Sequence, residues 1–416
     1  MTRWKTSRRQ FLWMGAAGVS ALATLKGRPA PLFQGSPVSC AVIGCGRWGR
    51  EIIESLAAMP EARVVAYCDL YEPYRRRVSR MLPEASGYSD LASMLEEKSE
   101  IEAVFVATPT HLHREPVEAA LSAGKHVYCE APMASTIEDA RAIAQAASQS
   151  DVVFGVGLQH RVSPLVDHTG NFLRARAVGS LVTEEGHDYQ NTSWRRAVSN
   201  PDFEKSLNWR LDPEVTLGLE GEAGVHVFDH SLRFQGQVPV SVSGFGSLMR
   251  WHDGREVPDT VFVVFEYPNG LLSRFEASLA NSFRRQYYLI NGTEGSILME
   301  PQRSWWFKEA DARTLGWEVY ATREKIGNEE GIILRADATK LLQEGKIPSK
   351  ADETGGELQD EPLYIALGEF LTSVRGDKPF AAGALEGFQS AVMALKAHQA
   401  VALGGRIDMD GGDFEI

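Results

Sequence analysis

One stretch of the sequence, residues 41–69, constrains the fold more than any other. An apolar run leads into the spaced glycines Gly44, Gly46 and Gly49, and Asp69 closes the next apolar run 20 positions after the last glycine. In a strand–turn–helix unit the first glycine permits the tight turn, and the second lets the backbone approach a pyrophosphate. The third lets the helix pack against the strand, and the helix N-terminus attracts phosphate. The pattern predicts a dinucleotide-binding βαβ unit.

Asp69 indicates which dinucleotide this unit binds. A carboxylate at the end of the second strand accepts hydrogen bonds from the ribose hydroxyls and repels a 2′-phosphate. Arg75 and Arg76 follow closely enough to attract such a phosphate. We therefore predict NAD as the cofactor, with NADP as the weaker alternative.

Strand and helix patterns alternate through about residue 155. We expect strands at 39–44, 63–69, 103–107, 126–129 and 152–155, and helices at 47–58, 73–81, 88–97, 113–123 and 136–148. This alternation predicts an α/β fold that begins with a Rossmann domain, a doubly wound parallel sheet that binds ligands beyond the carboxyl ends of its strands.

From about residue 160 the pattern changes to alternating β-branched and aromatic segments, at 238–246, 260–267, 273–280 and 286–292. They predict a large, mainly antiparallel open sheet. Residues 327–357 are charged and lack aromatic side chains, so we expect a surface excursion there, before helices at 362–375 and 385–403. The predicted domains are 38–158, which binds NAD, and 159–416, an α/β domain for substrate and oligomer contacts whose last helices can pack back on the first domain.

The first residues have the composition of a targeting signal. Ser7–Leu12 contains Arg8 and Arg9 in a twin-arginine pattern, a short apolar run follows at 11–19, and Ala21–Ala23 has the small residues of a cleavage site. We interpret residues 1–37 as a twin-arginine signal peptide and arm, which predicts a periplasmic or extracellular protein. A chance Arg–Arg pair before a core helix is the alternative.

The charge and the cysteines limit the partners. A formal net charge of −12 argues against nucleic acid as a partner. The body of the chain has no run of 18 apolar residues, so we expect no stable membrane insertion after signal cleavage. The four cysteines lack metal-ligand spacing, so we predict free thiols and no metal site; a disulfide in an exported protein is the alternative.

Later motifs carry a family resemblance. Residues 107–113 read Ala-Thr-Pro-Thr-His-Leu-His, and 123–132 read Ala-Gly-Lys-His-Val-Tyr-Cys-Glu-Ala-Pro, followed in order by motifs at 155–161, 209–212 and 221–226. This succession resembles the Gfo/Idh/MocA family of sugar oxidoreductases. The resemblance implies a carbohydrate substrate, nicotinamide against loops 108–113 and 130–132, and a homo-oligomer formed through the open sheet of the second domain.

Together with the glycine pattern, the resemblance defines the candidate cofactor-binding residues: Gly44, Gly46, Arg47, Trp48, Gly49, Asp69, Thr108, Pro109, His113, Glu130, Pro132 and Gln159. Among them, His113 fits a helix start below the nicotinamide pocket better than an acid–base role.

The sequence departs from the family at two positions. The usual Glu-Lys-Pro is Glu130-Ala131-Pro132 here, and in typical members that lysine moves the proton of the reacting hydroxyl. The usual Asp four residues before the motif histidine is Glu222. We hypothesise that the longer Glu222 side chain reaches toward the space that Ala131 leaves.

Oxidation of a hydroxyl needs a proton acceptor within hydrogen-bond reach. His226 is the best remaining candidate because imidazole titrates near neutrality. Glu222 and His230, one helical turn to either side, complete the candidate catalytic set; a buried polar packing role is the alternative for His230, and a surface or salt-bridge role for Glu222. The candidate substrate-binding residues combine aromatic faces with guanidinium groups, with ordinary packing as the alternative: Arg161, Tyr189, Trp209 and Arg210.

Three functions remain open. The first is an exported NAD(P)-dependent oxidoreductase that transfers hydride to or from a sugar hydroxyl and holds its cofactor tightly. The second is an NAD-dependent glycosidase or glycoside lyase that oxidises a ring hydroxyl transiently and eliminates the aglycone; relatives with that chemistry also lack the lysine. The third is a non-catalytic sugar-binding relative.

Overall fold

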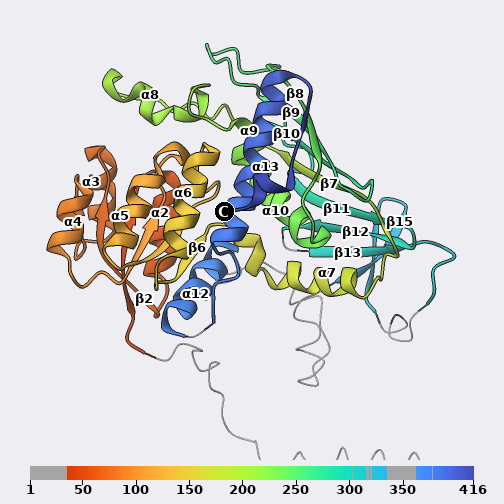
Figure 1. Ribbon diagram of the computed structural model, residues 1–416, viewed down its shortest axis with the longest axis horizontal. Coiled ribbons are helices and arrows are strands. Elements are labelled where there is room, and N and C mark those ends of the chain that lie inside the picture. The colour runs from red at the N-terminus through yellow and green to blue at the C-terminus, as the bar shows by residue number, and fades with distance from the viewer. Residues whose placement is uncertain (1–34, 302, 315–317, 319–320, 335–361, 377) are drawn as a thin grey trace, which may run out of the picture. The chain divides into compact units, whose positions relative to one another are not determined.

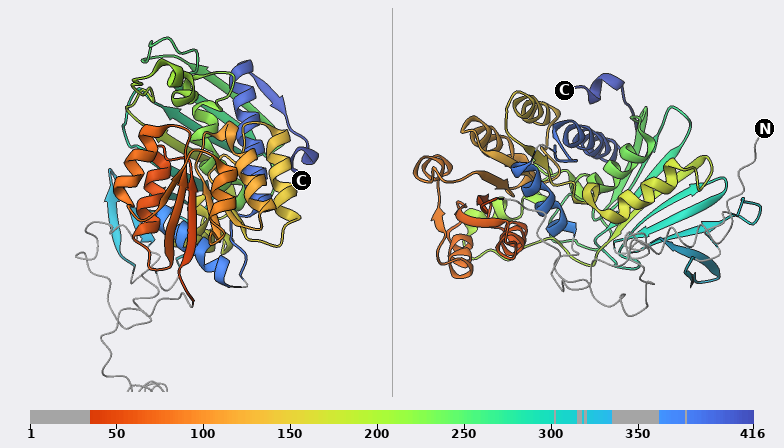
Figure 2. Two further views of the ribbon diagram at one scale, coloured as in Figure 1. Left: turned by 90° about the vertical axis from the view of Figure 1, so that its left-hand side faces the viewer. Right: turned by 90° about the horizontal axis from the view of Figure 1, so that it is seen from below.

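The first sheet consists of six parallel strands in the order β3-β2-β1-β4-β5-β6. The computed structural model describes residues 35–301, 303–314, 318, 321–334, 362–376 and 378–416. The strands are β1 (Val38–Ile43), β2 (Ala62–Cys68), β3 (Ser86–Tyr88), β4 (Ala103–Val106), β5 (His126–Cys129) and β6 (Phe154–Val156). The helices among them are α2 (Arg47–Ala57), α3 (Glu72–Met81), α4 (Leu91–Glu97), α5 (Arg114–Ser122) and α6 (Ile137–Ser148). They lie on both sides of the sheet (Figures 1 and 2).

Burial explains the composition of these strands. All residues of β1 and β4 are buried, as in parallel strands that helices cover on both faces. The predicted doubly wound sheet is confirmed, and its strand order is that of a dinucleotide-binding domain. One detail was wrong: Tyr88 belongs to the short strand β3, and α4 begins only at Leu91, after Asp90 caps it by accepting a hydrogen bond from the N–H of Ser93.

The second sheet has ten strands in the order β14-β15-β13-β12-β11-β7-β10-β9-β8-β16. Only the pair β7–β10 is parallel; the other pairs among the described strands are antiparallel, as predicted for this sheet. The strands are β7 (Leu181–Tyr189), β8 (Ser241–Ser247), β9 (Thr260–Glu266), β10 (Leu272–Ser278), β11 (Gln286–Gly292), β12 (Gly295–Glu300), β13 (Arg303–Lys308), β14 (Arg323–Ile326), β15 (Glu329–Leu334) and β16 (Arg406–Asp408).

Helices cover one face of this sheet (Figures 1 and 2). They include α7 (Pro164–Arg174), α9 (Gly218–Glu222), α10 (Gly224–Gln235) and α13 (Ala384–Leu403). In β9, Val261, Val263 and Phe265 are buried against the helices, whereas Phe262 between them is 45% exposed on the open face. A period of two therefore separates a covered face from an open one.

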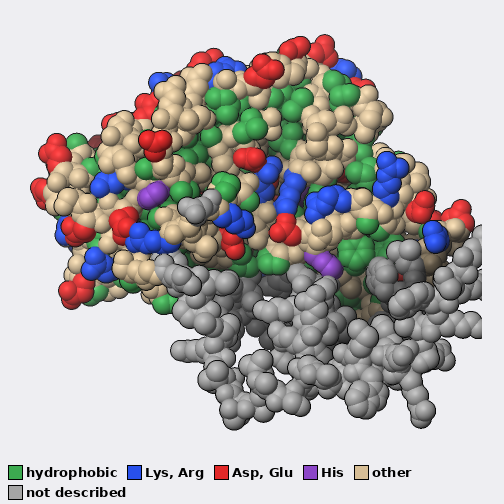
Figure 3. Space-filling model, turned by 60° about the horizontal axis from the view of Figure 1, so that its bottom comes forward, with side chains coloured by type: hydrophobic (Ala, Val, Ile, Leu, Met, Phe, Trp, Pro, Cys, Tyr) green, Lys and Arg blue, Asp and Glu red, His purple; other side chains and the backbone are tan. Residues whose placement is uncertain are grey.

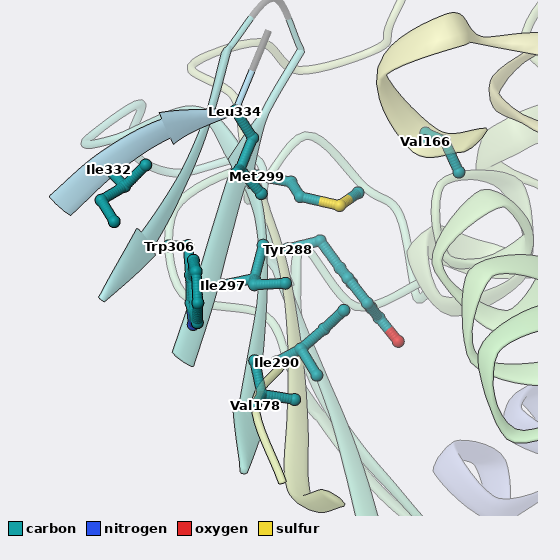
Figure 4. Packing of buried hydrophobic residues seen from close by; sticks show 9 residues of the cluster. All are labelled: Val166, Val178, Tyr288, Ile290, Ile297, Met299, Trp306, Ile332 and Leu334. Atoms are coloured by element: carbon teal, nitrogen blue, oxygen red, sulfur yellow. The ribbon is translucent and has the colours of Figure 1, made fainter. Parts of the chain in front are cut away.

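A hydrophobic cluster fills the space between the outer half of the sheet and α7 (Figure 4). It consists of Val166, Val178, Tyr288, Ile290, Ile297, Met299, Trp306, Ile332 and Leu334. Ile332 and Leu334 lie on β15, so the prediction that residues 327–357 form a surface excursion was wrong for this strand. Residues 335–357 of that segment lie outside the described residues.

Helix α13 packs against both sheets. A Cβ at Gly387 of α13 would lie 2.4 Å from the Val156 side chain of β6, and a Cβ at Gly244 of β8 would lie 2.8 Å from Val401 of α13. Each glycine therefore permits a close approach that a larger residue would block. Helix α12 (Pro362–Arg375) also joins the first sheet, because Arg375 pairs with Glu102 just before β4.

Shorter helical elements connect these parts: η1 (Thr110–Leu112), η2 (Gln159–Val162), η3 (Pro201–Phe203), α8 (Glu204–Leu207), η4 (Trp209–Leu211) and η8 (Gly411–Phe414). All four cysteines are buried and free, as predicted. No helix of the described segments has the length and apolar character needed to cross a bilayer. Acidic and basic side chains are interspersed on the face in Figure 3. The predicted twin-arginine signal lies outside the described residues.

Candidate active site

The turn between β1 and α2 has the geometry of a phosphate-binding loop. Gly44 has φ +91°, and a Cβ there would lie 2.5 Å from the carbonyl oxygen of Ala107. A Cβ at Gly49 would lie 1.8 Å from the carbonyl oxygen of Gly44, so only glycine lets α2 pack there. At Gly46 a Cβ would meet only Tyr74, 3.9 Å away. The space beside Gly46 is thus left for a ligand, next to the N-terminus of α2.

Asp69 is held in a defined orientation at the end of β2. Its Oδ2 accepts a hydrogen bond from the N–H of Cys45 at 2.6 Å, and its Oδ1 accepts one from the N–H of Tyr71 at 2.7 Å. Each oxygen keeps a lone pair for a ribose hydroxyl. Arg75 donates to the carbonyl oxygens of Asp69 and Leu70, and Arg76 pairs with Glu72. Both arginines that could have attracted the 2′-phosphate of NADP therefore contact other groups of the chain.

His113 joins the two loops predicted to hold nicotinamide. Its Nδ1 lies 3.1 Å from the carbonyl oxygen of Pro132, and its Nε2 lies 2.9 Å from that of Thr108. Burial lowers the pKa of His113 to about 4 although both carbonyls favour the protonated form. The ring thus joins the two loops through their carbonyl oxygens. The Ala131–Pro132 peptide bond is cis.

Glu130 has a buried carboxyl group that faces the same space. Its side chain packs so closely on Gly157 that a Cβ there would lie 2.5 Å from Oε2, while Oε1 has no hydrogen-bond partner among the described residues. Burial raises the pKa of Glu130 to about 8, against a hydrogen bond with Trp48 that lowers it. Near neutral pH the group is therefore largely protonated and can donate a hydrogen bond to a ligand.

The loop η1 and helices α9 and α10 bring the candidate proton-transfer groups together. Thr110 Oγ1 donates a hydrogen bond to Glu222 Oε1 at 2.9 Å, and Arg210 Nη2 lies 3.5 Å from Glu222 Oε2. Burial raises the pKa of Glu222, and Arg210 opposes that shift. Glu222 thus contacts Thr110 and Arg210.

His226 lies one turn after Glu222, with its ring 5.5 Å from that of His160. Its Nδ1 is buried and lacks a hydrogen-bond partner in the part of the chain that the structure describes. Burial, and to a smaller extent His160, lower the pKa of His226 to about 3. The imidazole is therefore neutral at physiological pH with a free ring nitrogen, and it is a weaker base than a free imidazole.

One cavity of about 610 Å³ connects these groups. Its lining includes most of the predicted site residues: Gly44, Gly46, Arg47, Trp48, Asp69, Thr108, Pro109, His113, Glu130, Gln159, Trp209, Arg210, Glu222 and His226. Ala131 also lines it and brings only a methyl group to this wall. Arg210 stacks over the ring of Trp209, with its guanidinium carbon 4.4 Å from the ring centroid.

Five predicted residues do not line the cavity. Gly49 and Pro132 lie behind it and shape the loops. His230 is buried, with its ring 5.4 Å from that of His160 and against Phe234. Arg161 pairs with buried Asp229 at 2.8 Å. The ring of Tyr189 stacks 3.9 Å from that of His187, which is hydrogen-bonded to Glu276 of β10. The structure therefore gives Tyr189 and His230 ring contacts and Arg161 an ion pair, instead of a place in the cavity wall.

Other lining residues were not among the candidates. Tyr71, Tyr74 and Phe203 line the cavity near Asp69, and Thr110 lines it near Glu222. The tyrosines directly follow Asp69 in the sequence, which was a usable signal. Phe203 carried none, because its position depends on the path of a long connection.

These residues fit a pyridine dinucleotide. The space beside Gly46, the oriented carboxylate of Asp69 and the unpartnered Oε1 of Glu130 all face one continuous cavity. No cluster of three or more His, Cys, Asp or Glu side chains suited to a metal ion occurs among the described residues.

Comparison with known proteins agrees with this geometry. Residues 38–158 match the Gfo/Idh/MocA model described as an oxidoreductase family with an NAD-binding Rossmann fold, and residues 176–298 match the Gfo/Idh/MocA C-terminal domain. The chain belongs to the Gfo/Idh/MocA family. The predicted family, fold class and NAD cofactor are confirmed, and the chain is an oxidoreductase of the Gfo/Idh/MocA type.

Characterised Gfo/Idh/MocA relatives act on sugar derivatives. The chain is 26% identical over 292 residues to 2,7-anhydro-N-acetylneuraminate hydratase of Escherichia coli (strain K12), which covers 69% of this chain and 74% of that protein. It is 27% identical over 270 residues to levoglucosan dehydrogenase of Pseudarthrobacter phenanthrenivorans. That alignment covers 59% of this chain and 66% of that protein. A solved structure of levoglucosan dehydrogenase with NADH and levoglucosan has a similar fold, with a TM-score of 0.72 and 22% sequence identity. The superposition covers 89% of this chain and 99% of that one.

Proposed function

We propose that this protein is exported by the twin-arginine route and transfers hydride between a sugar hydroxyl and a tightly held NAD. The observation that carries the proposal is that His226 and Glu222 line the same cavity as the glycine turn and Glu130. NAD, when bound, accepts or returns the hydride. The remaining chemistry belongs to the side chains of this chain.

His226 acts as the proton acceptor for the reacting hydroxyl. Its imidazole is neutral near pH 7, so a ring nitrogen has a lone pair free for the proton, although burial makes it a weaker base than a free imidazole. Glu222, Thr110 and Arg210 form a hydrogen-bonded and ion-paired group beside it that orients the sugar. The Trp209 ring offers an apolar face to the sugar C–H groups, although the stacked Arg210 covers part of it.

Glycoside cleavage through transient oxidation is the second candidate. In that reaction His226 would remove the hydroxyl proton while the hydride passes to bound NAD⁺. The ketone so formed acidifies the neighbouring C–H, and loss of that proton expels the aglycone, which takes up a proton. Water then adds to the double bond, and return of the hydride restores the hydroxyl. The methyl group of Ala131 and the likeness to an anhydrosugar hydratase favour this candidate. A non-catalytic sugar-binding role is the third.

Incubation with free sugars and with aryl glycosides, without added NAD, separates the candidates. Accumulation of reduced cofactor with free sugars supports the oxidoreductase, and aglycone release supports the glycosidase. Sugar binding with neither signal supports the non-catalytic relative. Purified protein that contains no pyridine nucleotide and binds none would exclude the first two functions.

His226→Ala tests the proton acceptor. We expect turnover to fall by about 100-fold or more, the usual range for a lost general base, while NADH binding is kept. His252→Ala, at an exposed position, is the matched control. Turnover of His226→Ala equal to that of the control would remove His226 from this role.

A further inference from the structure

A segment between β7 and α9 extends from the second sheet to the nucleotide-binding part. It comprises residues 194–209, here called the bridging segment, and includes η3 and α8. In Figure 1, α8 lies above the helices of the first sheet, far from the strands of the second. The bridging segment is therefore placed near the Rossmann helices although it follows a strand of the other sheet.

Two contacts join the bridging segment to α3. The ring of Phe203 lies 4.8 Å from that of Tyr71, and Arg196 Nη1 donates a hydrogen bond to the hydroxyl of Tyr74 at 3.2 Å. Tyr71 and Tyr74 pack edge to face at 4.9 Å. Both tyrosines come directly after the strand end that carries Asp69.

The bridging segment is also held internally. Asn208 accepts a hydrogen bond from the N–H of Arg196 at 2.7 Å and donates one to the carbonyl oxygen of Arg196 at 3.1 Å. Arg195 pairs with Glu204 within the segment and with Asp253 outside it. These contacts give Arg196 a defined position beside α3.

The position of the bridging segment relates it to one half of the dinucleotide. Asp69, which marks the adenosine ribose, lines the cavity together with Tyr71, Tyr74, Arg196 and Phe203. The glycine turn forms the pyrophosphate side of the same cavity. Residues of the bridging segment thus form a wall at the adenosine end, contributed from outside the Rossmann sheet.

We propose that Arg196 and Phe203 of the bridging segment complete the adenosine subsite and retain NAD through successive turnovers. This inference rests on the NAD site of the proposed function. The cofactor leaves only when the Phe203–Tyr71 and Arg196–Tyr74 contacts open, so these contacts slow its release. Retention suits an exported enzyme, which has little free NAD around it.

Release of NADH from the loaded protein tests the inference. The protein is loaded with NADH and diluted into excess NAD⁺, and the loss of bound NADH fluorescence gives the release rate. We expect Phe203→Ala and Arg196→Ala to release NADH at least about tenfold faster than the unmodified protein. Asp202→Ala, an exposed change in the same segment, should release it at the unmodified rate.

Tyr74→Phe provides a second variant that keeps the packing. It removes only the hydroxyl that accepts from Arg196, so it should also speed release while the thermal midpoint of the apoprotein is unchanged. Release from all three cavity variants at the rate of Asp202→Ala would overturn the role of the bridging segment. Failure of the unmodified protein to bind NADH would instead contradict the NAD site itself.

Discussion

Residue 131 brings no proton-transfer group to the cavity wall. Ala131 lines the cavity with a methyl group, which neither accepts nor donates a proton. The groups that can do so lie on other elements: Glu222 at the end of α9 and His226 in α10. Both are buried, and burial disfavours the charged form of each. The cavity therefore offers a neutral imidazole where a proton acceptor is required.

Glu130 leads to a prediction about stability and pH. Burial raises its pKa from 4.5 to about 8 in the folded protein. The folded chain therefore keeps a proton that the unfolded chain loses, and this stabilisation is complete below pH 4.5 and lost as the pH rises through 8. Glu130→Gln cannot titrate, so we expect its apoprotein to gain stability relative to the unmodified protein from pH 5 to pH 9, by on the order of 4 kcal/mol.

Thermal or urea unfolding of both apoproteins at several pH values measures this difference. Glu138→Gln, at an exposed position in α6, is the control and should show no such trend. A constant difference between Glu130→Gln and the unmodified protein across this range would mean that Glu130 is ionised in the fold.

In the β1–α2 unit, one glycine is needed for packing and another leaves space for a ligand. Gly49 lies against the backbone of Gly44, whereas the space beside Gly46 is open. We expect Gly49→Ala to lower the free energy of unfolding by about 1–3 kcal/mol, because the new methyl group has no room against the Gly44 carbonyl. Gly46→Ala should melt near the unmodified temperature but bind NADH at least about tenfold more weakly, because the methyl group occupies the ligand's space.

Circular dichroism melting and NADH fluorescence titration on the same two variants distinguish these effects. The substitution is identical in both, so each variant is the control for the other. Normal NADH affinity in Gly46→Ala would mean that the dinucleotide backbone does not approach this turn.

The second sheet has one face that packs on helices and one face that is open. On the helix side, β9 presents Val261, Val263 and Phe265, all buried. On the open side, Phe245 of β8 pairs across the strands with Phe262 of β9, and they are 59% and 45% exposed. A pair of adjacent exposed aromatic side chains on a broad sheet is a feature of surfaces that another protein covers.

At the scale of the whole molecule, we expect the open face to form a homo-oligomer. Leu272 of β10, at 46% exposure, lies on the same face, opposite Glu266 of β9. Phe262→Glu places a charge beside Phe245, so we expect the variant to dissociate into smaller species while keeping its secondary structure. Light scattering during size-exclusion chromatography measures the mass; Leu403→Glu, at a 67% exposed position that ends α13, is the control.

An unchanged mass for Phe262→Glu would argue against this face as the assembly surface. A monomeric unmodified protein at micromolar concentration would contradict oligomer formation altogether.

Much of the fold followed from local patterns. The apolar period, the glycine spacing and Asp69 predicted most strands of the Rossmann sheet to within two residues. These signals are local, because each comes from residues within one βαβ unit. The three-residue strand β3 is too short to show a period. Strand β15 was taken for a surface excursion, because its burial depends on the hydrophobic cluster of distant strands.

The local sequence is enough to predict a dinucleotide site, since the turn, the helix start and the carboxylate lie within 30 residues of one another along the chain. The tertiary structure is needed to know which side chains share the cavity. It placed His226 and Glu222 there, gave His230 and Tyr189 ring contacts, and paired Arg161 with Asp229. It also brought Phe203 to Tyr71 across 132 positions of sequence. Contacts of that kind depend on how helices and connections pack, which spacing along the chain does not encode.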